Sequence, residues 1–225
     1  MEVYHIGPDA LSLSSSHSIF GNVTILHKLW PKSSETEHLF VGTDRSAYFT
    51  VSWDRTAQQL KTEKTFVDLA DRSVRASQTG DRCHTDPKGH VMVLEIFEGV
   101  LTLIPLLQKH KKKSNDIEEG DLGDPMTIRI AELFVRSTAF LTSYFPSVTV
   151  GSKLEKARVA FLYEDNHSKI QLSVKELGPV KGAPNTYEIG EDEVLQMEVD
   201  AGATHLIPLP APASMFNPNP KTYRD

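Results

Sequence analysis

Apolar residues in this chain fall into short runs that are separated by polar turns. The clearest example is HVMVLEIFEGVLTLIPL, residues 90–106, in which the runs Val91–Phe97 and Val100–Leu106 flank the pair Glu98-Gly99. A glycine in such a pair supplies the positive φ that a two-residue hairpin turn requires. The pattern predicts a β-hairpin whose first strand is buried.

Two other stretches share this organisation, HLFVGTDRSAYFTVSW at 38–53 and ARVAFLYEDNHSKIQLSVKEL at 157–177. Aligning Leu39, Met92 and Val159 gives spacings of 53 and 67 residues, longer than the roughly 40–45 of the commonest propeller repeat. We interpret them as a degenerate repeat of hairpins, one per propeller blade. The predicted fold class is all-β, a partial, open β-propeller of about three to four blades covering residues 1–210.

The strands in the remaining segments are predicted from the alternation of apolar and polar residues and from the positions of turn residues. We expect antiparallel neighbours at 1–6, 11–20 and 23–30, and an outer strand with one wet face at 60–69. Residues 126–144 are predicted to form two strands with a turn near Arg136-Ser137. Further predicted strands are 147–150, 194–199 and 204–209, whereas 71–89 and 178–190 are predicted to be irregular.

Two segments lack core character. Residues 109–124, KHKKKSNDIEEGDLGD, are predicted to be a charged surface loop or disordered insertion. The proline-rich residues 211–225 are predicted to be a disordered tail, because proline cannot pair in a central strand. The strand pattern begins at Met1 without a lead-in, so we expect a fragment or a truncated gene model.

Composition and charge narrow the possible classes of function. With 225 residues and 39% apolar residues, the chain is long enough to bury a sizeable core. The net charge of −6 gives no domain-wide attraction to nucleic-acid phosphates. A single cysteine, Cys83, excludes an internal disulfide and a cysteine-based zinc cluster. Because no long apolar run and no signal-peptide pattern is present, we expect a soluble intracellular protein without membrane contact.

No motif in the sequence predicts catalysis. The nearest approach to a metal-ligand pair is Cys83-His84, but adjacent residues on a strand point to opposite faces. The serines Ser14–Ser16 beside His17 lack a nucleophile-elbow pattern. We therefore expect no enzyme activity, no cofactor and no metal. Trp30 and Trp53 are expected to belong to blade cores.

The irregular segment 71–79 carries the best candidates for a binding site. Loops of this kind frequently present recognition groups, and Arg72, Arg75, Gln78 and Thr79 are the residues assigned here to partner binding. The alternative is that the two arginines form ion pairs with Asp71 and Asp81 and brace adjacent blades.

A family resemblance rests on an ordered set of residues around the central hairpin. The set comprises Asp71-Arg72, Arg75, Gln78-Thr79-Gly80, Asp86-Pro87, Glu98-Gly99-Val100-Leu101 and Leu103-Ile104-Pro105-Leu106. In this order, they resemble the first propeller of the family shared by the large subunits of the UV-damaged-DNA-binding protein and of the cleavage and polyadenylation specificity factor. The hairpin 159–177 resembles the next blade, and 1–32 the preceding one. Cys83 and His84 depart from the family, which has apolar residues there.

This resemblance implies a seven-bladed propeller, one of three in a scaffold. Such a scaffold links substrate receptors to a cullin-RING ubiquitin ligase and contributes to DNA repair, in the nucleus and also in the cytoplasm. The implied partners are the receptors and the sister propellers, and nucleic acid is reached only through them. Two alternatives remain: a paralogous scaffold for pre-mRNA 3′-end processing or splicing, and a truncated product without independent function.

Overall fold

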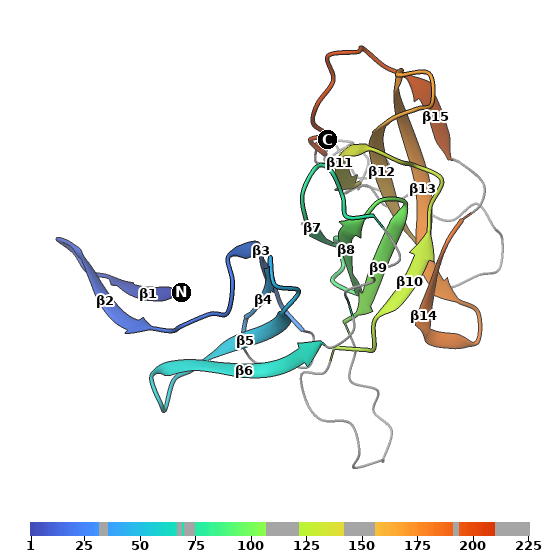
Figure 1. Ribbon diagram of the computed structural model, residues 1–225. Helices are drawn as coiled ribbons and strands as arrows, with labels where there is room; N and C mark the ends of the chain where they lie inside the picture. Colours follow the sequence, from blue (N-terminus) through green and yellow to red (C-terminus); the bar gives the residue numbers. More distant parts are fainter. Residues whose placement is uncertain are drawn as a thin grey trace, which may run out of the picture. The chain divides into compact units, whose positions relative to one another are not determined.

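The computed structural model describes residues 1–31, 36–66, 69, 75–106, 122–141, 156–190 and 194–209, and these contain 15 strands and no helix (Figure 1). No helix among these residues is long and apolar enough to cross a membrane. The chain divides into two compact units, Met1–Phe134 and Val135–Asp225.

The first unit contains three antiparallel sheets. A two-stranded sheet is followed by two four-stranded sheets, in each of which neighbouring strands are consecutive in the chain. The two-stranded sheet pairs β1 (Glu2–Ile6) with β2 (Leu11–Ser16). The first four-stranded sheet contains β3 (Val23–Leu29), β4 (His38–Thr43), β5 (Tyr48–Asp54) and β6 (Gln59–Phe66), and the second contains β7 (Arg82–Thr85), β8 (Val91–Phe97), β9 (Val100–Pro105) and β10 (Met126–Arg129).

The second unit is one five-stranded sheet. Its main path runs β11-β12-β13-β14, and β15 pairs with a different part of β13. The strands are β11 (Val135–Phe140), β12 (Ala157–Glu164), β13 (Ile170–Val180), β14 (Ala183–Ile189) and β15 (Leu195–Glu198).

The three predicted hairpins are confirmed as the middle pairs of three separate sheets. They are β4-β5, β8-β9 and β12-β13. Gly99 adopts φ 66°, as the predicted turn of the central hairpin requires. Each middle pair is flanked by further strands of its own sheet, which is the arrangement of a propeller blade. The predicted fold class, an all-β partial propeller, is therefore confirmed.

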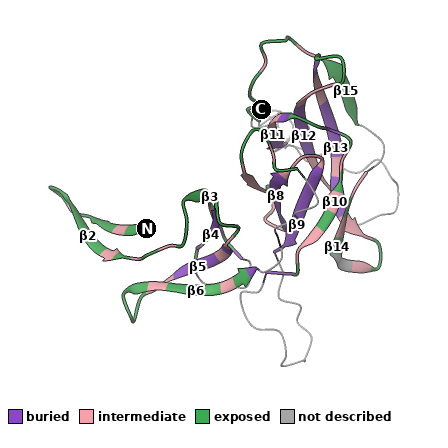
Figure 2. Ribbon diagram, in the orientation of Figure 1, coloured by how far each residue is buried: buried purple, intermediate pink, exposed green. Residues whose placement is uncertain are grey.

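The middle strands supply most of the core, as the buried segments in Figure 2 show for β8 and β9. Phe40, Met92, Leu94 and Ile104 are all fully buried in one cluster of the first unit. Phe40 stacks on Tyr48 with ring centroids 6.4 Å apart. The outer strand β6 is exposed or half-buried at every position except its last residue, Phe66, consistent with the predicted wet face.

The prediction that residues 11–20 and 23–30 form neighbouring antiparallel strands is wrong. β2 ends at Ser16, and β3 pairs with β4 instead. Gly21 turns the chain at φ 95°, and the Asp44 carboxylate then accepts hydrogen bonds from the backbone N–H (2.8 Å) and the side chain (2.9 Å) of Asn22. These bonds fix the start of β3 beside the β4-β5 turn.

The turn expected at Arg136-Ser137 is also wrong, because both residues lie within β11. The connection between the two strands, β10 and β11, comes earlier in the chain. There, Phe134 adopts φ 53°, and the Ile130 N–H donates to the Gly99 carbonyl over 3.0 Å. The predicted strand 204–209 is not formed, since the Leu206 N–H donates to the Ser137 side chain (3.0 Å) rather than to a neighbouring strand. The sequence prediction also missed β7 and β14, whose residues were predicted to be irregular.

Several predictions fall on residues outside those described. They concern the strand 147–150, most of the charged segment 109–124 and the tail 211–225. These remain predictions.

Candidate protein-binding surface

The predicted recognition segment runs beside the end of β8. The Ser77 N–H donates to the Ile96 carbonyl and the Glu98 N–H donates to the Arg75 carbonyl, both over 2.9 Å, and Ala76 forms a bridge with Phe97. These bonds hold residues 75–77 as a short extension of the sheet. The side chains that follow are thereby placed at the β8-β9 turn.

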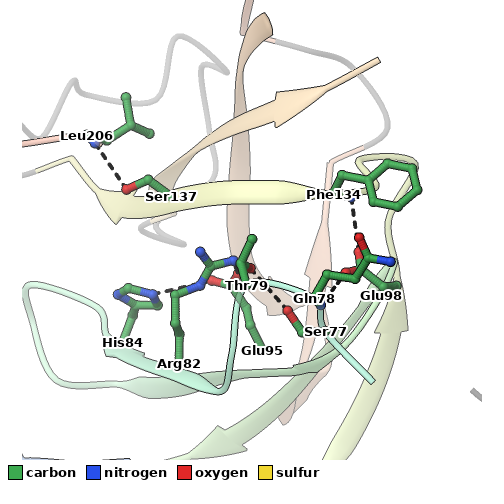
Figure 3. A network of polar contacts seen from close by, with 10 residues as sticks. All are labelled: Ser77, Gln78, Thr79, Arg82, His84, Glu95, Glu98, Phe134, Ser137 and Leu206. Atoms are coloured by element: carbon green, nitrogen blue, oxygen red, sulfur yellow. Dashed lines mark hydrogen bonds and ion pairs between the residues drawn. The ribbon is translucent and has the colours of Figure 1, made fainter. Parts of the chain in front are cut away.

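Glu98 joins this segment to a second loop (Figure 3). One carboxylate oxygen accepts a hydrogen bond from the Gln78 N–H (2.8 Å), and the other accepts one from the Phe134 N–H (3.0 Å). Both loops are therefore tied to the hairpin turn by a single side chain. Sequence reasoning used Glu98 only as a turn residue, because nothing in the local pattern indicates which backbone amides a carboxylate will reach.

Phe134 has an unusual backbone conformation for a large aromatic residue, since φ values near +53° are favourable mainly for glycine. Its side chain and that of Leu133 remain 38% and 41% exposed. Leu133 lies over the turn, where a Cβ added to Gly99 would come within 2.8 Å of it. The same turn thus presents two apolar side chains beside the polar segment 75–79.

The structure brings three of the four predicted site residues together. Arg75, Gln78 and Thr79 are exposed and close in sequence, and the Thr79 hydroxyl lies 3.2 Å from that of Ser77. Arg72 lies outside the described residues. The Arg75 guanidinium makes no hydrogen bond or ion pair with any described residue, and Asp81 instead accepts a hydrogen bond from Thr24 (2.8 Å). The proposed brace between Arg75 and Asp81 is therefore not formed.

A buried ionic cluster lies on β7 and β8 (Figure 3). Arg82 pairs with Glu95 over 2.8 Å, and His84 lies 3.3 Å from the other oxygen of the same carboxylate, which is only 5% exposed. Arg82 and Glu95 are direct cross-strand partners, so they share one face of the sheet. This cluster fixes β7 on β8 and explains how a strand that contains the polar residues Arg82 and His84 can form.

Cys83 occupies the opposite face and packs against the hydrophobic core. Burial, together with the nearby Glu95 charge, raises the pKa of the Cys83 thiol well above its ordinary value. The expected separation of Cys83 from His84 is confirmed, because they lie on opposite faces of β7. Among the described residues, no group of three or more His, Cys, Asp or Glu side chains is arranged to hold a metal ion.

The signal that could have revealed β7 is a weak alternation. Cys83 and Thr85 face Leu94 and Met92, whereas Arg82 and His84 point the other way. On the core side, His27 of β3 lies 2.8 Å from the Thr85 hydroxyl, which links the two four-stranded sheets. Burial lowers the pKa of His27, and the nearby His84 lowers it further.

The expected core position of Trp30 is wrong. Trp30 is 57% exposed, because it follows β3 at the sheet's edge, and Trp53 is half-buried. Both line an open hollow of about 520 Å³ together with Leu39 and Leu60. This hollow contains none of the predicted site residues.

In the second unit, the segment after β15 is held by side chains of β11. Arg136 pairs with Glu164 over 2.9 Å and donates to the carbonyl of Ala203 over 3.2 Å. Ser137 accepts from Leu206, as described above. The side chains of Ile207 and Leu209 are left 80% and 79% exposed.

These features are those of a propeller built from blades, and the comparison with known proteins agrees. The model of the RSE1/DDB1/CPSF1 first β-propeller matches residues 1–217. The chain belongs to this family. The resemblance drawn from the sequence is thereby confirmed.

Individual relatives are DNA damage-binding proteins. The chain is 32% identical over 203 residues to DNA damage-binding protein 1 of Schizosaccharomyces pombe, covering 90% of this chain and 17% of that protein. It is 26% identical to DNA damage-binding protein 1b of Arabidopsis thaliana over 217 residues, covering 94% of this chain and 17% of the relative. It is also 26% identical to DNA damage-binding protein 1 of Oryza sativa subsp. japonica, again covering 94% of this chain and 17% of the relative. The chain thus spans about a sixth of the length of these relatives.

Proposed function

We propose that this chain is a protein-binding scaffold that links substrate receptors to a cullin-RING ubiquitin ligase and contributes to DNA repair. The observation that carries the proposal is the family match over residues 1–217, joined by relatives that carry the name DNA damage-binding protein. The chain acts by contact with other proteins, in the nucleus and also in the cytoplasm. Nucleic acid is reached through its partners.

The contact surface in this proposal is the loop pair joined by Glu98. Arg75, Gln78 and Thr79 contribute charge and hydrogen-bonding groups, and Leu133 and Phe134 contribute apolar area. A polar segment beside exposed aromatic and aliphatic side chains is the composition typical of protein–protein interfaces. Glu98 binds Gln78 and Phe134 through their backbone amides, so this contact does not engage the side chains of these two residues.

The test is proximity labelling by the tagged full-length chain in cells of its own organism. Cullin-RING subunits and receptors should be enriched, and the double substitution Arg75→Ala, Gln78→Ala should lower their enrichment about tenfold. Arg45→Ala, an exposed arginine in the β4-β5 turn, is the matched control and should change nothing. Enrichment of pre-mRNA processing or splicing factors in place of ligase subunits contradicts the proposal and supports the paralogous scaffold.

A further inference from the structure

Three side chains lie in a row beside the β8-β9 turn. Ala76 forms an isolated bridge with Phe97, so the backbone on either side of it is extended. Alternate residues of an extended segment lie on the same side, which places Arg75 and Ser77 together. The row continues to Thr79, because the Ser77 and Thr79 hydroxyls are 3.2 Å apart (Figure 3). An arginine and two hydroxyl groups thus share one side of a loop whose residues are mostly exposed.

Ser77 lies between a cation and an anion. The Glu98 carboxylate accepts a hydrogen bond from the Gln78 N–H over 2.8 Å. Covalent geometry keeps the Ser77 hydroxyl within about 4 Å of this nitrogen, and therefore within about 7 Å of the carboxylate oxygen. This separation is inside the Debye length of about 8 Å at physiological ionic strength, so a charge on Ser77 acts on Glu98 with little screening. Two residues before Ser77, the Arg75 guanidinium makes no hydrogen bond or ion pair with any described residue.

We propose that Ser77 is a phosphorylation site and that its phosphate moves the attachment of the loop from Glu98 to Arg75. The Ser77 hydroxyl oxygen attacks the γ-phosphorus of ATP, the bond from this phosphorus to the β-phosphate oxygen breaks, ADP leaves, and the hydroxyl proton passes to the carboxylate base of a protein kinase. This inference adds a modification to the surface described above. Only its effect on partner binding rests on the proposed function.

The phosphate changes the balance of charge around the loop. A phosphoserine carries a charge of about −1.5 to −2 at pH 7, so it repels the Glu98 carboxylate. The Arg75 guanidinium, on the same side of the loop, donates charge-assisted hydrogen bonds to the phosphate oxygens. Glu98 then leaves the Gln78 N–H, and it leaves the Phe134 N–H as well, since one side chain holds both. The two loops are thereby released from each other.

The loop is attached weakly enough for an enzyme to reach the serine. Backbone hydrogen bonds of 2.9 Å hold it to the end of β8, from the Ser77 N–H to the Ile96 carbonyl and from the Glu98 N–H to the Arg75 carbonyl. Segments held by few hydrogen bonds open locally at a small cost in free energy. The kinase that fits has an acidic substrate groove, because Arg72 and Arg75 precede the acceptor serine.

The first test asks whether the modification occurs. The tagged full-length chain is purified from cells of its own organism, and its peptides are analysed by mass spectrometry. A phosphate is expected on Ser77, and Arg75→Ala should lower its occupancy about tenfold, because the kinase loses a basic group that it recognises. Ser168 is the matched control, because it is exposed in the β12-β13 turn, has Asn166 two positions earlier, and should carry no phosphate. Absence of phosphate from Ser77 overturns the proposal, and so does an occupancy that Arg75→Ala leaves unchanged.

The second test asks whether the phosphate releases Glu98. Phosphoserine is incorporated at position 77 of the 225-residue chain during synthesis, and amide hydrogen exchange is compared with that of the unmodified chain. Exchange at Gln78 and Phe134 should quicken at least about threefold, whereas phosphoserine at Ser168 should change neither amide. In Glu98→Gln, the side chain keeps an acceptor oxygen without the charge, so the phosphate should have no such effect.

The outcomes separate this proposal from the proposed function. Unchanged exchange at both amides overturns the release of Glu98, and so does an equal response in Glu98→Gln, since repulsion between charges is then not its cause. Both measurements are made without a partner protein. A phosphate on Ser77 that releases Glu98 therefore supports this inference even where proximity labelling finds no ligase subunits, a result that contradicts the proposed function alone.

Discussion

The hairpins β1-β2 and β8-β9 each join two short antiparallel strands through a turn, but their environments are opposite. In β8, six of seven residues are buried, whereas β1 has no buried residue. β8 and β9 are flanked by β7 and β10, and their apolar faces meet the core. The local sequence pattern therefore specifies a hairpin in both cases, and the number of neighbouring strands decides whether its apolar side chains stabilise the fold.

The largest contrast is expected from removing one leucine from each hairpin. Leu94→Ala should lower the free energy of unfolding by about 2–5 kcal/mol, because a fully buried side chain leaves a cavity. Leu11→Ala, at an exposed position, should change it by no more than about 0.5 kcal/mol. Urea denaturation of both variants measures the difference. Equal losses would show that the hairpins share one environment.

The buried ion pair offers a second contrast. Arg82→Ala leaves the Glu95 carboxylate without its closest cation and should cost about 3 kcal/mol. Lys28→Ala removes an exposed pair with Glu37 and should cost no more than about 1 kcal/mol. The combined change Arg82→Met, Glu95→Leu should recover most of the loss, as judged by thermal and urea unfolding. No recovery would mean that the cluster does more than neutralise buried charge.

Loss of the Glu98 side chain should have an intermediate effect confined to two loops. Glu98→Ala removes the acceptor for two backbone amides and should cost about 1–2 kcal/mol. Hydrogen exchange should quicken at Gln78 and Phe134 and remain unchanged in β4 and β5. Glu37→Ala provides an exposed control. Unchanged exchange at both amides would contradict the role assigned to Glu98.

The smallest effect expected is on the pH dependence of stability. Burial would raise the pKa of Asp86, but hydrogen bonds from His90 and Val91 outweigh it and the pKa is lowered overall. A carboxylate whose pKa is lower in the folded chain stabilises it above the unfolded pKa, and this contribution is lost as the pH falls. Asp86→Asn should therefore flatten the decline in stability that begins below about pH 5, near the unfolded pKa, and continues as the pH falls through the lower folded pKa. An unchanged pH profile in urea titrations would exclude this contribution.

The sequence predicts the middle of each blade well and its margins poorly. Runs such as Val91–Phe97 are buried on both faces, so hydrophobicity alone identifies them. β7 and β14 were missed because their contribution depends on partners, such as Glu95 for Arg82, that lie elsewhere in the chain. The strand predicted at 204–209 has suitable residues but is held by Ser137 instead of a neighbouring strand.

The candidate surface shows the same limit. Loop composition alone pointed to Arg75, Gln78 and Thr79, and all three are exposed. Leu133 and Phe134 join them only because Glu98 bonds to a backbone amide 36 positions away. Such a long-range bond has no counterpart in the periodicity of the sequence.

The environment of Cys83 makes this residue a built-in reporter of blade opening. Because its half-buried thiol packs against the core and has a raised pKa, alkylating reagents should modify it slowly while β7 is paired with β8 and faster once β7 has left β8. Since Cys83 is the single cysteine in the chain, the rate of its modification reports on these openings without an added label. The chain thus contains its own reporter for the separation of β7, the least regular strand of the central blade, from β8.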